Sequence, residues 1–302
     1  MSAQPLYPGV FADPFVLRRG NQYFAYGTGY RGDDGVFEVL RSPDLRHWIR
    51  AGAALVPLDA GVGDEYWAPE VAFADGAYWM YYSVGHGIQG HHIRVARSDS
   101  ATGPFEDLGR NLTPGETFAI DPHPFLDDDG RWYLFYARDV LTSDRVGTHL
   151  AVAPMVSMTE LEPSSVVLEP NDDWQIYERD RAMYDSVYDW HTLEGPAVIR
   201  RLDRYWLTYS GGAWTGPGYG VAWAYAPSPL GPWEHGEGAR ILSSTPEQLG
   251  PGHSSLTMVD GGDAIVYHAW DPAMTGRRMF ANRITFTDGG PQLGGAILGG
   301  EG

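Results

Sequence analysis

The unit Ala12-Asp13-Pro14-Phe15-Val16 returns four more times, in altered form, along a chain of 302 residues. The later copies are Trp67-Ala68-Pro69-Glu70-Val71, Ile120-Asp121-Pro122-His123-Pro124-Phe125, Glu194-Gly195-Pro196-Ala197-Val198 and Gly252-His253-Ser254-Ser255-Leu256. The copies recur at intervals of roughly 50 to 75 residues, a period typical of propeller blades rather than of helical solenoids. Each copy is therefore expected to open one blade.

A second run of aromatic and aliphatic residues follows every copy, and these runs are too short for helices. The runs are Gln22–Gly27, Ala77–Ser83, Arg131–Tyr136, Arg204–Ser210 and Asp263–His268. Turn signals such as Asp128-Asp129-Gly130 separate copy and run, and Asp-Gly between two apolar runs indicates a hairpin. Third strands are expected at Gly35–Ser42, His92–Ser98 and Gly220–Ala226. Two of them lead into similar Gly-Pro-aromatic turns, at Ala101–Phe105 and Pro229–Trp233.

The repeats predict an all-β fold, a five-bladed β-propeller with about 60 residues in each blade. Such blades fill residues 1–302 as a single domain and leave no room for a second one. A β-sandwich would also explain the strands, but not why the same strand order and turns return five times.

Composition limits the classes of partner. The formal net charge of −18 argues against nucleic acid or an anionic membrane, because contacts to phosphate need a basic face. Cysteine is absent, which excludes disulfides and thiol chemistry, and no run of about 18 apolar residues predicts a membrane span. Residues 1–9 lack the pattern of a signal peptide, so we expect a cytoplasmic protein, or a secreted one whose leader is not in this sequence. Nothing in the sequence indicates an oligomeric state.

Three carboxylates open inner strands of the repeat: Asp13, Asp121 and Glu194, in blades one, three and four. We expect them at equivalent positions, with Glu70 and His253 at the corresponding places of blades two and five. Inner strands of a propeller line its central channel, so the three carboxylates would face one pocket. Two carboxylates suffice to hydrolyse a glycosidic bond, and a third raises the pKa of the acid.

Turn formation is the alternative explanation for each Asp-Pro pair. Asp271-Pro272 is such a turn, since no apolar strand follows it. The shared placement of Asp13 and Asp121 at the start of repeated strands favours a catalytic role for those two.

Taken together, the five motifs resemble glycoside hydrolase family 43, over a stretch from about Tyr7 to about Phe286. The resemblance implies a five-bladed propeller that cleaves xylosides, arabinofuranosides or arabinans with inversion. It implies Asp13 as the general base, Glu194 as the general acid, and Asp121 as the residue that orients and tunes the acid. Inversion needs an acid and a base about 6.5 to 9.5 Å apart, with room for the attacking water.

The same resemblance implies roles for other residues. His253 corresponds to a histidine on the propeller axis, often near a cation with water ligands, so Ca²⁺ or Na⁺ is expected there, in a structural or tuning role. No other cofactor is expected. A loop histidine held by backbone hydrogen bonds is the alternative. Arg277 resembles an arginine that reaches into the active site, although Arg278 next to it leaves the register open and a surface arginine is the alternative.

Trp67 and Trp190 lie near Glu70 and Glu194, and a tryptophan face stacks well on a sugar, although core packing between blades is the commoner fate. Glu70 stands where many relatives carry an aspartate, which leaves its role open. The segment 85–92, with three histidines, lacks the acidic or thiol partners of a metal site and is expected to be a loop that lines the pocket.

The leading hypothesis is an exo-acting α-L-arabinofuranosidase on arabinan or arabinoxylan oligosaccharides from plant cell walls. A long loop at residues 171–191 would close one end of its cleft. A β-xylosidase is the main alternative, because the two pentoses present similar hydroxyl patterns. An endo-arabinanase is disfavoured, since residues 137–140 do not resemble the Gly-rich segment of such enzymes. Fructan-cleaving propellers carry a Glu-Cys pair that a chain without cysteine lacks. A non-catalytic sugar-binding propeller is the alternative outside the enzymes.

Overall fold

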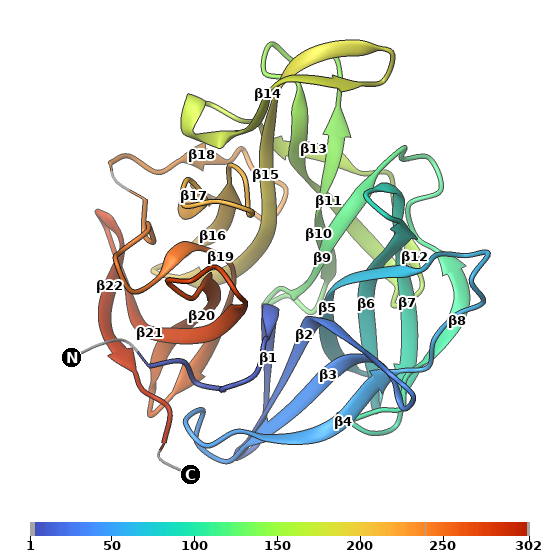
Figure 1. Ribbon diagram of the computed structural model, residues 1–302, viewed down its shortest axis with the longest axis vertical. Coiled ribbons are helices and arrows are strands. Elements are labelled where there is room, and N and C mark those ends of the chain that lie inside the picture. Colours follow the sequence, from blue (N-terminus) through green and yellow to red (C-terminus); the bar gives the residue numbers. More distant parts are fainter. Residues whose placement is uncertain (1–3, 239, 301–302) are drawn as a thin grey trace.

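The computed structural model describes residues 4–238 and 240–300, and there the strands form five antiparallel blades (Figure 1). Blade 1 consists of β1 (Ala12–Arg19), β2 (Gln22–Gly32), β3 (Gly35–Ser42) and β4 (Ile49–Leu55). Blade 2 consists of β5 (Glu65–Ala74), β6 (Ala77–His86), β7 (Gln89–Ser98) and β8 (Glu106–Asn111). Blade 3 consists of β9 (Ala119–Leu126), β10 (Trp132–Val140), β11 (Gly147–Ser157) and β13 (Ser165–Leu168), with the short β12 (Glu160–Leu161) beside β11.

Blades 4 and 5 complete the ring. Blade 4 consists of β15 (Ser186–Arg201), β16 (Arg204–Gly211), β17 (Gly220–Ala226) and β18 (Glu234–His235). Blade 5 consists of β19 (Leu249–Val259), β20 (Gly262–Trp270), β21 (Arg277–Thr287) and β22 (Gly290–Ile297). The innermost strands contact one another in the order β1, β5, β9, β15, β19 and back to β1, which closes the circle seen in Figure 1. The predicted five-bladed propeller is confirmed.

The hydrophobic core lies between the blades. Within the described ranges the buried apolar side chains form five clusters, and each cluster joins two neighbouring blades. Between blades 3 and 4, for example, Phe135 and Val152 pack with Leu207 and Ala224, all fully buried. Strands fit this arrangement because both faces of each inner blade strand are covered, so near-continuous apolar runs are favoured. No helix in the described part of the chain is long and apolar enough to cross a membrane.

Every innermost strand carries the same β-bulge, where its pairing with the second strand slips. One residue of each bulge lies in the left-handed region of backbone space, with φ between 47° and 57°. These residues are Asp13, Ala68, Asp121, Gly195 and His253. A bulge bends the strand and re-aims a side chain, and Asp, His and Gly tolerate this conformation better than most residues.

The bulge corrects two predicted positions. Glu194 pairs with Ser210 just as Ala12 pairs with Thr28, so Glu194 lies one residue before the place of Asp13. The position equivalent to Asp13 in blade 4 is Gly195. In blade 2 it is Ala68 rather than Glu70, whereas His253 does hold the equivalent place in blade 5.

The bulge also links neighbouring blades. Its left-handed residue points its backbone N–H at a side chain from the end of the second strand of the preceding blade. Four blades use this contact: Ala68 donates to Thr28 Oγ1 (2.8 Å), Asp121 to Ser83 Oγ (3.0 Å), His253 to Ser210 Oγ (2.7 Å) and Asp13 to His268 Nδ1 (3.1 Å). A buried N–H needs such a partner, because leaving it unpaired costs about 1 to 3 kcal/mol.

A second link spans three blades near the axis. The ring of His123 lies 2.7 Å, through Nδ1, from Oε2 of Glu70, and Nε2 accepts the backbone N–H of Val198 at 3.0 Å. Because Nε2 is an acceptor, Nδ1 carries the hydrogen and donates it to Glu70. Glu70 and His123 are both buried, so this answers the open question of Glu70: its carboxylate joins blades 2, 3 and 4.

Replacing Glu70 with alanine is therefore expected to lower the free energy of unfolding by about 2 to 3 kcal/mol, because the buried N–H of His123 loses a charged acceptor. Glu70→Gln, which keeps an acceptor oxygen, should lose less than half as much. Denaturant unfolding followed by tryptophan fluorescence measures both. Glu106→Ala, at an exposed position of β8, serves as the control and should change stability by less than about 0.5 kcal/mol. Equal losses for the alanine and glutamine variants would contradict the hydrogen-bonding role.

Candidate active site

Asp13, Asp121 and His253 meet at the centre of the ring. All three occupy the left-handed position of their bulges, and the two carboxylates are only 8% and 6% exposed. Nδ1 of His253 lies 3.6 Å from Oδ1 of Asp13 and 3.6 Å from Oδ2 of Asp121. The structure therefore brings residues of blades 1, 3 and 5 together, as the repeat predicted.

Asp13 lies beside positive charge. Nη1 of Arg277 donates to its Oδ1 at 3.0 Å, and His253 is close by. Burial alone would raise the pKa of Asp13, but the attraction of Arg277 and then of His253 outweighs it, and the pKa lies well below its ordinary value. Asp13 is therefore ionised at neutral pH, which is the state that a general base requires.

Glu194 has the opposite environment. Burial, and then the negative charge of Asp121, raise the pKa of Glu194 to about 8. The hydroxyl of Tyr219 donates to its Oε1 at 2.6 Å, which leaves the other oxygen to carry a proton. A carboxyl group that keeps its proton at neutral pH is suited to act as a general acid.

Asp121 couples the two sides of the site. Burial, and then the charge of Asp13, raise its pKa to about 8, while a hydrogen bond from the N–H of Gly195 to Oδ2 (2.9 Å) favours its ionised form. Asp121 and Glu194 thus each disfavour the ionisation of the other. Two carboxyls placed in this way release their protons as a pair.

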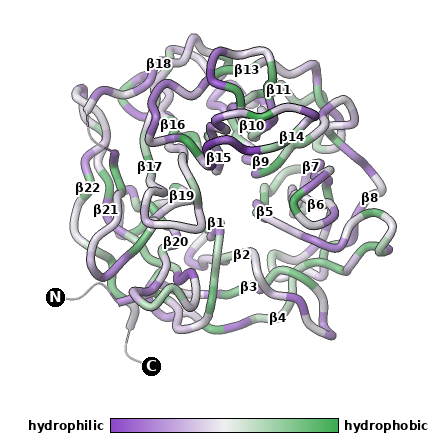
Figure 2. The backbone as a smooth tube through the Cα atoms, turned by 45° about the horizontal axis from the view of Figure 1, so that its top comes forward, coloured by the Kyte–Doolittle hydropathy of each residue, from purple (hydrophilic) through white to green (hydrophobic). Residues whose placement is uncertain are grey.

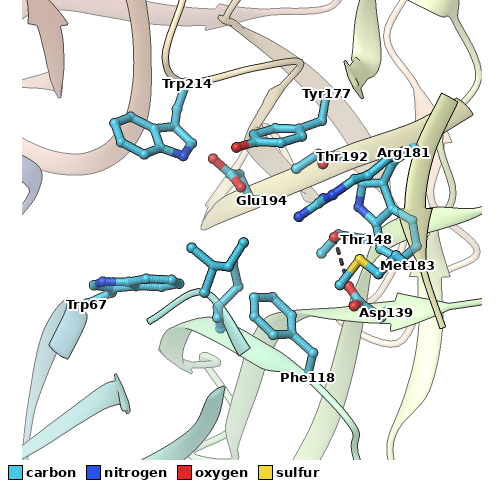
Figure 3. Close-up of a pocket in the computed structure, with 13 residues that line it drawn as sticks. Trp67, Phe118, Asp139, Thr148, Tyr177, Arg181, Met183, Thr192, Glu194 and Trp214 are labelled. Atoms are coloured by element: carbon cyan, nitrogen blue, oxygen red, sulfur yellow. Dashed lines mark hydrogen bonds between the residues drawn. The ribbon is translucent and has the colours of Figure 1, made fainter. Parts of the chain in front are cut away.

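A pocket opens above Glu194 at the seam between blades 3 and 4. In Figure 3 the carboxyl of Glu194 faces this cavity beside Tyr177 and Trp214, with Trp67 and Phe118 on the opposite side. Other lining residues include Asp139, Thr148, Arg181, Met183, Trp190 and Thr192. The wall is thus rich in aromatic rings with a few polar groups, the composition expected for a sugar site.

The segment predicted as a long loop at 171–191 has regular structure instead. It forms a 3-10 turn, η1 (Asp173–Gln175), and the strand β14 (Ile176–Met183), which pairs with the start of β15 as a hairpin that projects from blade 4 (Figure 1). The strand β14 is largely hydrophilic, as the purple stretches in Figure 2 show. It nevertheless has one face on the pocket. There the guanidinium of Arg181 lies over the rings of Tyr177 (4.9 Å) and Trp190 (5.4 Å).

The remaining predicted residues are placed as follows. Arg277 contacts Asp13, which resolves the register, because Arg278 bonds to the carbonyl of Pro8 instead. Trp67 forms part of the pocket wall and stacks on His91, with ring centroids 3.6 Å apart. The segment 85–92, predicted as a loop, is instead the tip of the β6–β7 hairpin, from which Ile88 lines the pocket. Trp190 also borders the pocket but is only 1% exposed. It packs against Tyr184 and Tyr188, and a stacking role for it stays a prediction.

The cation predicted at His253 has few protein ligands to use. In residues 4–238 and 240–300, no group of three or more His, Cys, Asp and Glu side chains is arranged to hold a metal ion. An ion at His253 would therefore take most of its ligands from water, as the resemblance implies, and it stays a prediction.

Several site residues escaped the sequence analysis. His268 lies near the end of the second strand of blade 5, at the place where other blades carry Thr28, Ser83 or Ser210, so an alignment of the repeats would have found it. Tyr219 and Trp214 lie in the connection between β16 and β17, which contains none of the repeated motifs. The ring of Trp214 holds the guanidinium of Arg277 at 4.6 Å.

Comparison with known proteins agrees with this geometry. The family model of glycosyl hydrolases family 43 matches residues 2–291. A "Beta-D-galactofuranosidase xynD" of Aspergillus niger is 30% identical, over 97% of this chain and 84% of that protein. An "Extracellular exo-alpha-(1->5)-L-arabinofuranosidase" of Streptomyces chartreusis is 27% identical, over 85% of this chain and 79% of that protein.

Among solved structures, a thermostable family-43 glycoside hydrolase superposes with a TM-score of 0.85 at 30% identity and covers 100% of this chain and 98% of that one. The match of the family model over nearly the whole length, the fold and the paired carboxyls all lead to the same conclusion. The chain belongs to glycosyl hydrolases family 43 and is a glycoside hydrolase.

Proposed function

We propose that this glycoside hydrolase is an exo-acting α-L-arabinofuranosidase that removes terminal arabinofuranose from arabinan or arabinoxylan oligosaccharides, with inversion. The observation that carries the proposal is the pairing of an ionised Asp13 with a protonated Glu194 below a pocket walled on one side by the β14–β15 hairpin.

In the proposed reaction, water and the leaving group lie on opposite faces of the sugar ring. Asp13 removes a proton from the attacking water, and Glu194 gives its proton to the glycosidic oxygen as the bond to the anomeric carbon breaks. Asp121 helps to keep the proton on Glu194 until that step, because each of the two carboxyls disfavours the ionisation of the other. Arg277 holds the base in place through Oδ1.

The hairpin supports exo action. Tyr177, Arg181 and Met183 project from β14 along one side of the cavity that holds Glu194 (Figure 3). A polysaccharide chain that crosses the ring face in both directions would meet this wall. The terminal sugar of a chain, in contrast, is linked to only one other sugar. It can therefore enter the pocket while the rest of the chain extends away from the wall.

Relatives support a furanose ring, since those described above are named for galactofuranose and arabinofuranose. β-D-Galactofuranose has the ring configuration of α-L-arabinofuranose and one additional hydroxymethyl group. A β-D-galactofuranosidase is therefore the second candidate, favoured by the 30% identity to the Aspergillus enzyme. The β-xylosidase alternative needs the same carboxyls but a six-membered ring in the pocket.

Substitution of Glu194 tests the acid. Glu194→Gln should lower kcat on an arabinofuranosyl disaccharide by about 10²- to 10⁴-fold, because no proton reaches the leaving oxygen. On a dinitrophenyl arabinofuranoside, whose leaving group needs no proton, the loss should be much smaller. Calorimetric titration should show retained binding of the sugar. Glu106→Gln, far from the pocket, is the matched control. Full turnover of the disaccharide by Glu194→Gln would point to a non-catalytic sugar-binding propeller or to another acid.

The pH dependence follows from the raised pKa. Because Glu194 must be protonated to act and its pKa is raised to about 8, kcat/KM should hold through neutral pH and fall above about pH 8. The stability of the fold should change with pH in the same direction as kcat/KM. The folded protein keeps protons that the unfolded chain releases above about pH 4.5, so stability decreases as pH rises from there toward 8. The melting temperature of Glu194→Gln should therefore exceed that of the wild type by more at pH 8 than at pH 5. A rate that increases above pH 8 would contradict the assignment.

A substrate panel separates the sugars. We expect the highest kcat/KM on p-nitrophenyl α-L-arabinofuranoside, a lower value on the β-D-galactofuranoside and the lowest on the β-D-xylopyranoside. Arabinan oligosaccharides should release arabinose alone, and proton NMR should show the inverted anomer first. Preference for either of the other glycosides would select the corresponding alternative, and release of oligosaccharides from the middle of the chain would exclude exo action.

A further inference from the structure

Gly195 is the exception among the left-handed residues of the ring. At the other four bulges the backbone N–H donates to a side chain at the end of the second strand of the preceding blade. The N–H of Gly195 donates instead to the carboxylate of Asp121, at 2.9 Å. Within residues 4–238 and 240–300 this is the one hydrogen bond made to the side chain of Asp121.

The cause lies in blade 3, at a residue outside the five repeated motifs. In the strand register, Thr28 pairs with Ala12, Ser83 with Trp67, Ser210 with Glu194, and His268 with Gly252. The corresponding pair in blade 3 is Ala137 with Ile120. Ala137 is fully buried and carries no hydroxyl or imidazole. The N–H of Gly195 therefore finds no acceptor on β10, and Asp121 takes that place.

We propose that Ala137 is a positioning residue, which keeps Asp121 aimed at the general acid by offering no competing acceptor to the N–H of Gly195. It touches no substrate and acts only through Gly195. In blade 4 the carboxyl residue is offset by one position, so Glu194 directly precedes Gly195. The hydrogen bond from Gly195 to Asp121 therefore places Asp121 next to Glu194. The peptide unit between Glu194 and Gly195 thus follows the proposed acid directly and also donates the hydrogen bond that holds Asp121. The inference deepens the proposed function and rests on the role given there to Asp121.

Competition is a realistic expectation at this site. Where a hydroxyl is present, as in Thr28, Ser83 and Ser210, it accepts the bulge N–H at 2.7 to 3.0 Å. An N–H usually serves one strong acceptor, and a buried carboxylate that loses its donor binds a proton more readily. The charged or titratable groups that face Asp121 are Asp13, Glu70, Glu194, Tyr219, His253 and Arg277, and a change at Ala137 leaves all of them in place.

The test is Ala137→Ser in the full chain, with Ala137→Gly as the control that adds no acceptor. With the serine, Asp121 should bind a proton more readily and hold the proton of Glu194 less well. The alkaline limb of the kcat–pH profile should shift to lower pH by about one unit, and kcat near pH 8 should fall by about fivefold, with KM changed less than about twofold. Ala137→Gly should keep the wild-type profile. A serine variant that folds and keeps that profile would overturn the proposal.

A measurement on the unmodified enzyme keeps the test independent of folding of the variant. Labelling with carbonyl-¹³C glutamate and ¹⁵N glycine selects the Glu-Gly pairs, which occur only at 194–195, 237–238 and 301–302. One of these amide protons, that of Gly195, should lie downfield and titrate with the carboxyl pair near pH 8, where the pKa of Asp121 is about 8. Three amides that are all insensitive to pH in this range would exclude the contact.

The outcome for Glu194→Gln separates this inference from the function beneath it. If Glu194→Gln retains turnover, the proposed function fails. If Glu194→Gln is inactive but neither Ala137→Ser nor the Gly195 amide responds as described, the role of Ala137 alone is rejected.

Discussion

The left-handed residue at the start of each innermost strand governs both the ring and the pocket. By breaking the pairing with the second strand, the bulge releases one backbone N–H, and that N–H joins the neighbouring blade. The conformation is costly for residues other than glycine, on the order of 1 to 3 kcal/mol each. Asp13, Asp121 and His253 all adopt it, so the strain is concentrated where the carboxylates converge. Ala68 adopts it without a polar side chain, which shows that the linkage between blades requires it even away from the chemistry.

Placement of charge, rather than burial, separates the roles of the carboxyls. Burial raises the pKa of each of the three, yet Asp13 titrates far below Asp121 and Glu194. The difference arises because Arg277 contacts Asp13, whereas Asp121 and Glu194 face each other. The guanidinium of Arg277 also lies over the ring of Trp214, a cation–π contact that helps to hold it beside Asp13. An ionised carboxylate and a protonated carboxyl therefore coexist near the axis at neutral pH.

The repeat made the fold and the three carboxyls predictable from sequence, because every blade restates the same strand and turn signals. It did not reveal that Glu194 is offset by one residue, since Asp-Pro and Gly-Pro look equivalent until the pairing of Glu194 with Ser210 is known. The β14–β15 hairpin was predicted as a loop, and the structure shows why the repeat did not reveal it: its sequence is mostly polar, and it projects from the ring rather than entering the core. Tyr219 lies in an unrepeated connection, and only three-dimensional proximity assigns it to Glu194.

The chemistry and the sugar specificity have separate structural foundations. The carboxyls are held by bulges on the axis, whereas much of the pocket wall comes from a hairpin anchored by main-chain pairing at its root and by a hydrogen bond from Tyr184 Oη to Asp139 Oδ2. At that root β11 and β15 pair in parallel through Gly147 and His191. Gly147 has a positive φ of 152°, and a side chain there would overlap the backbone of His191, so the close approach requires glycine. None of these anchoring contacts uses Tyr177, Arg181 or Met183, so those side chains are free to vary without moving Glu194. A family that shares one set of catalytic carboxyls can in this way serve different furanosides and xylosides.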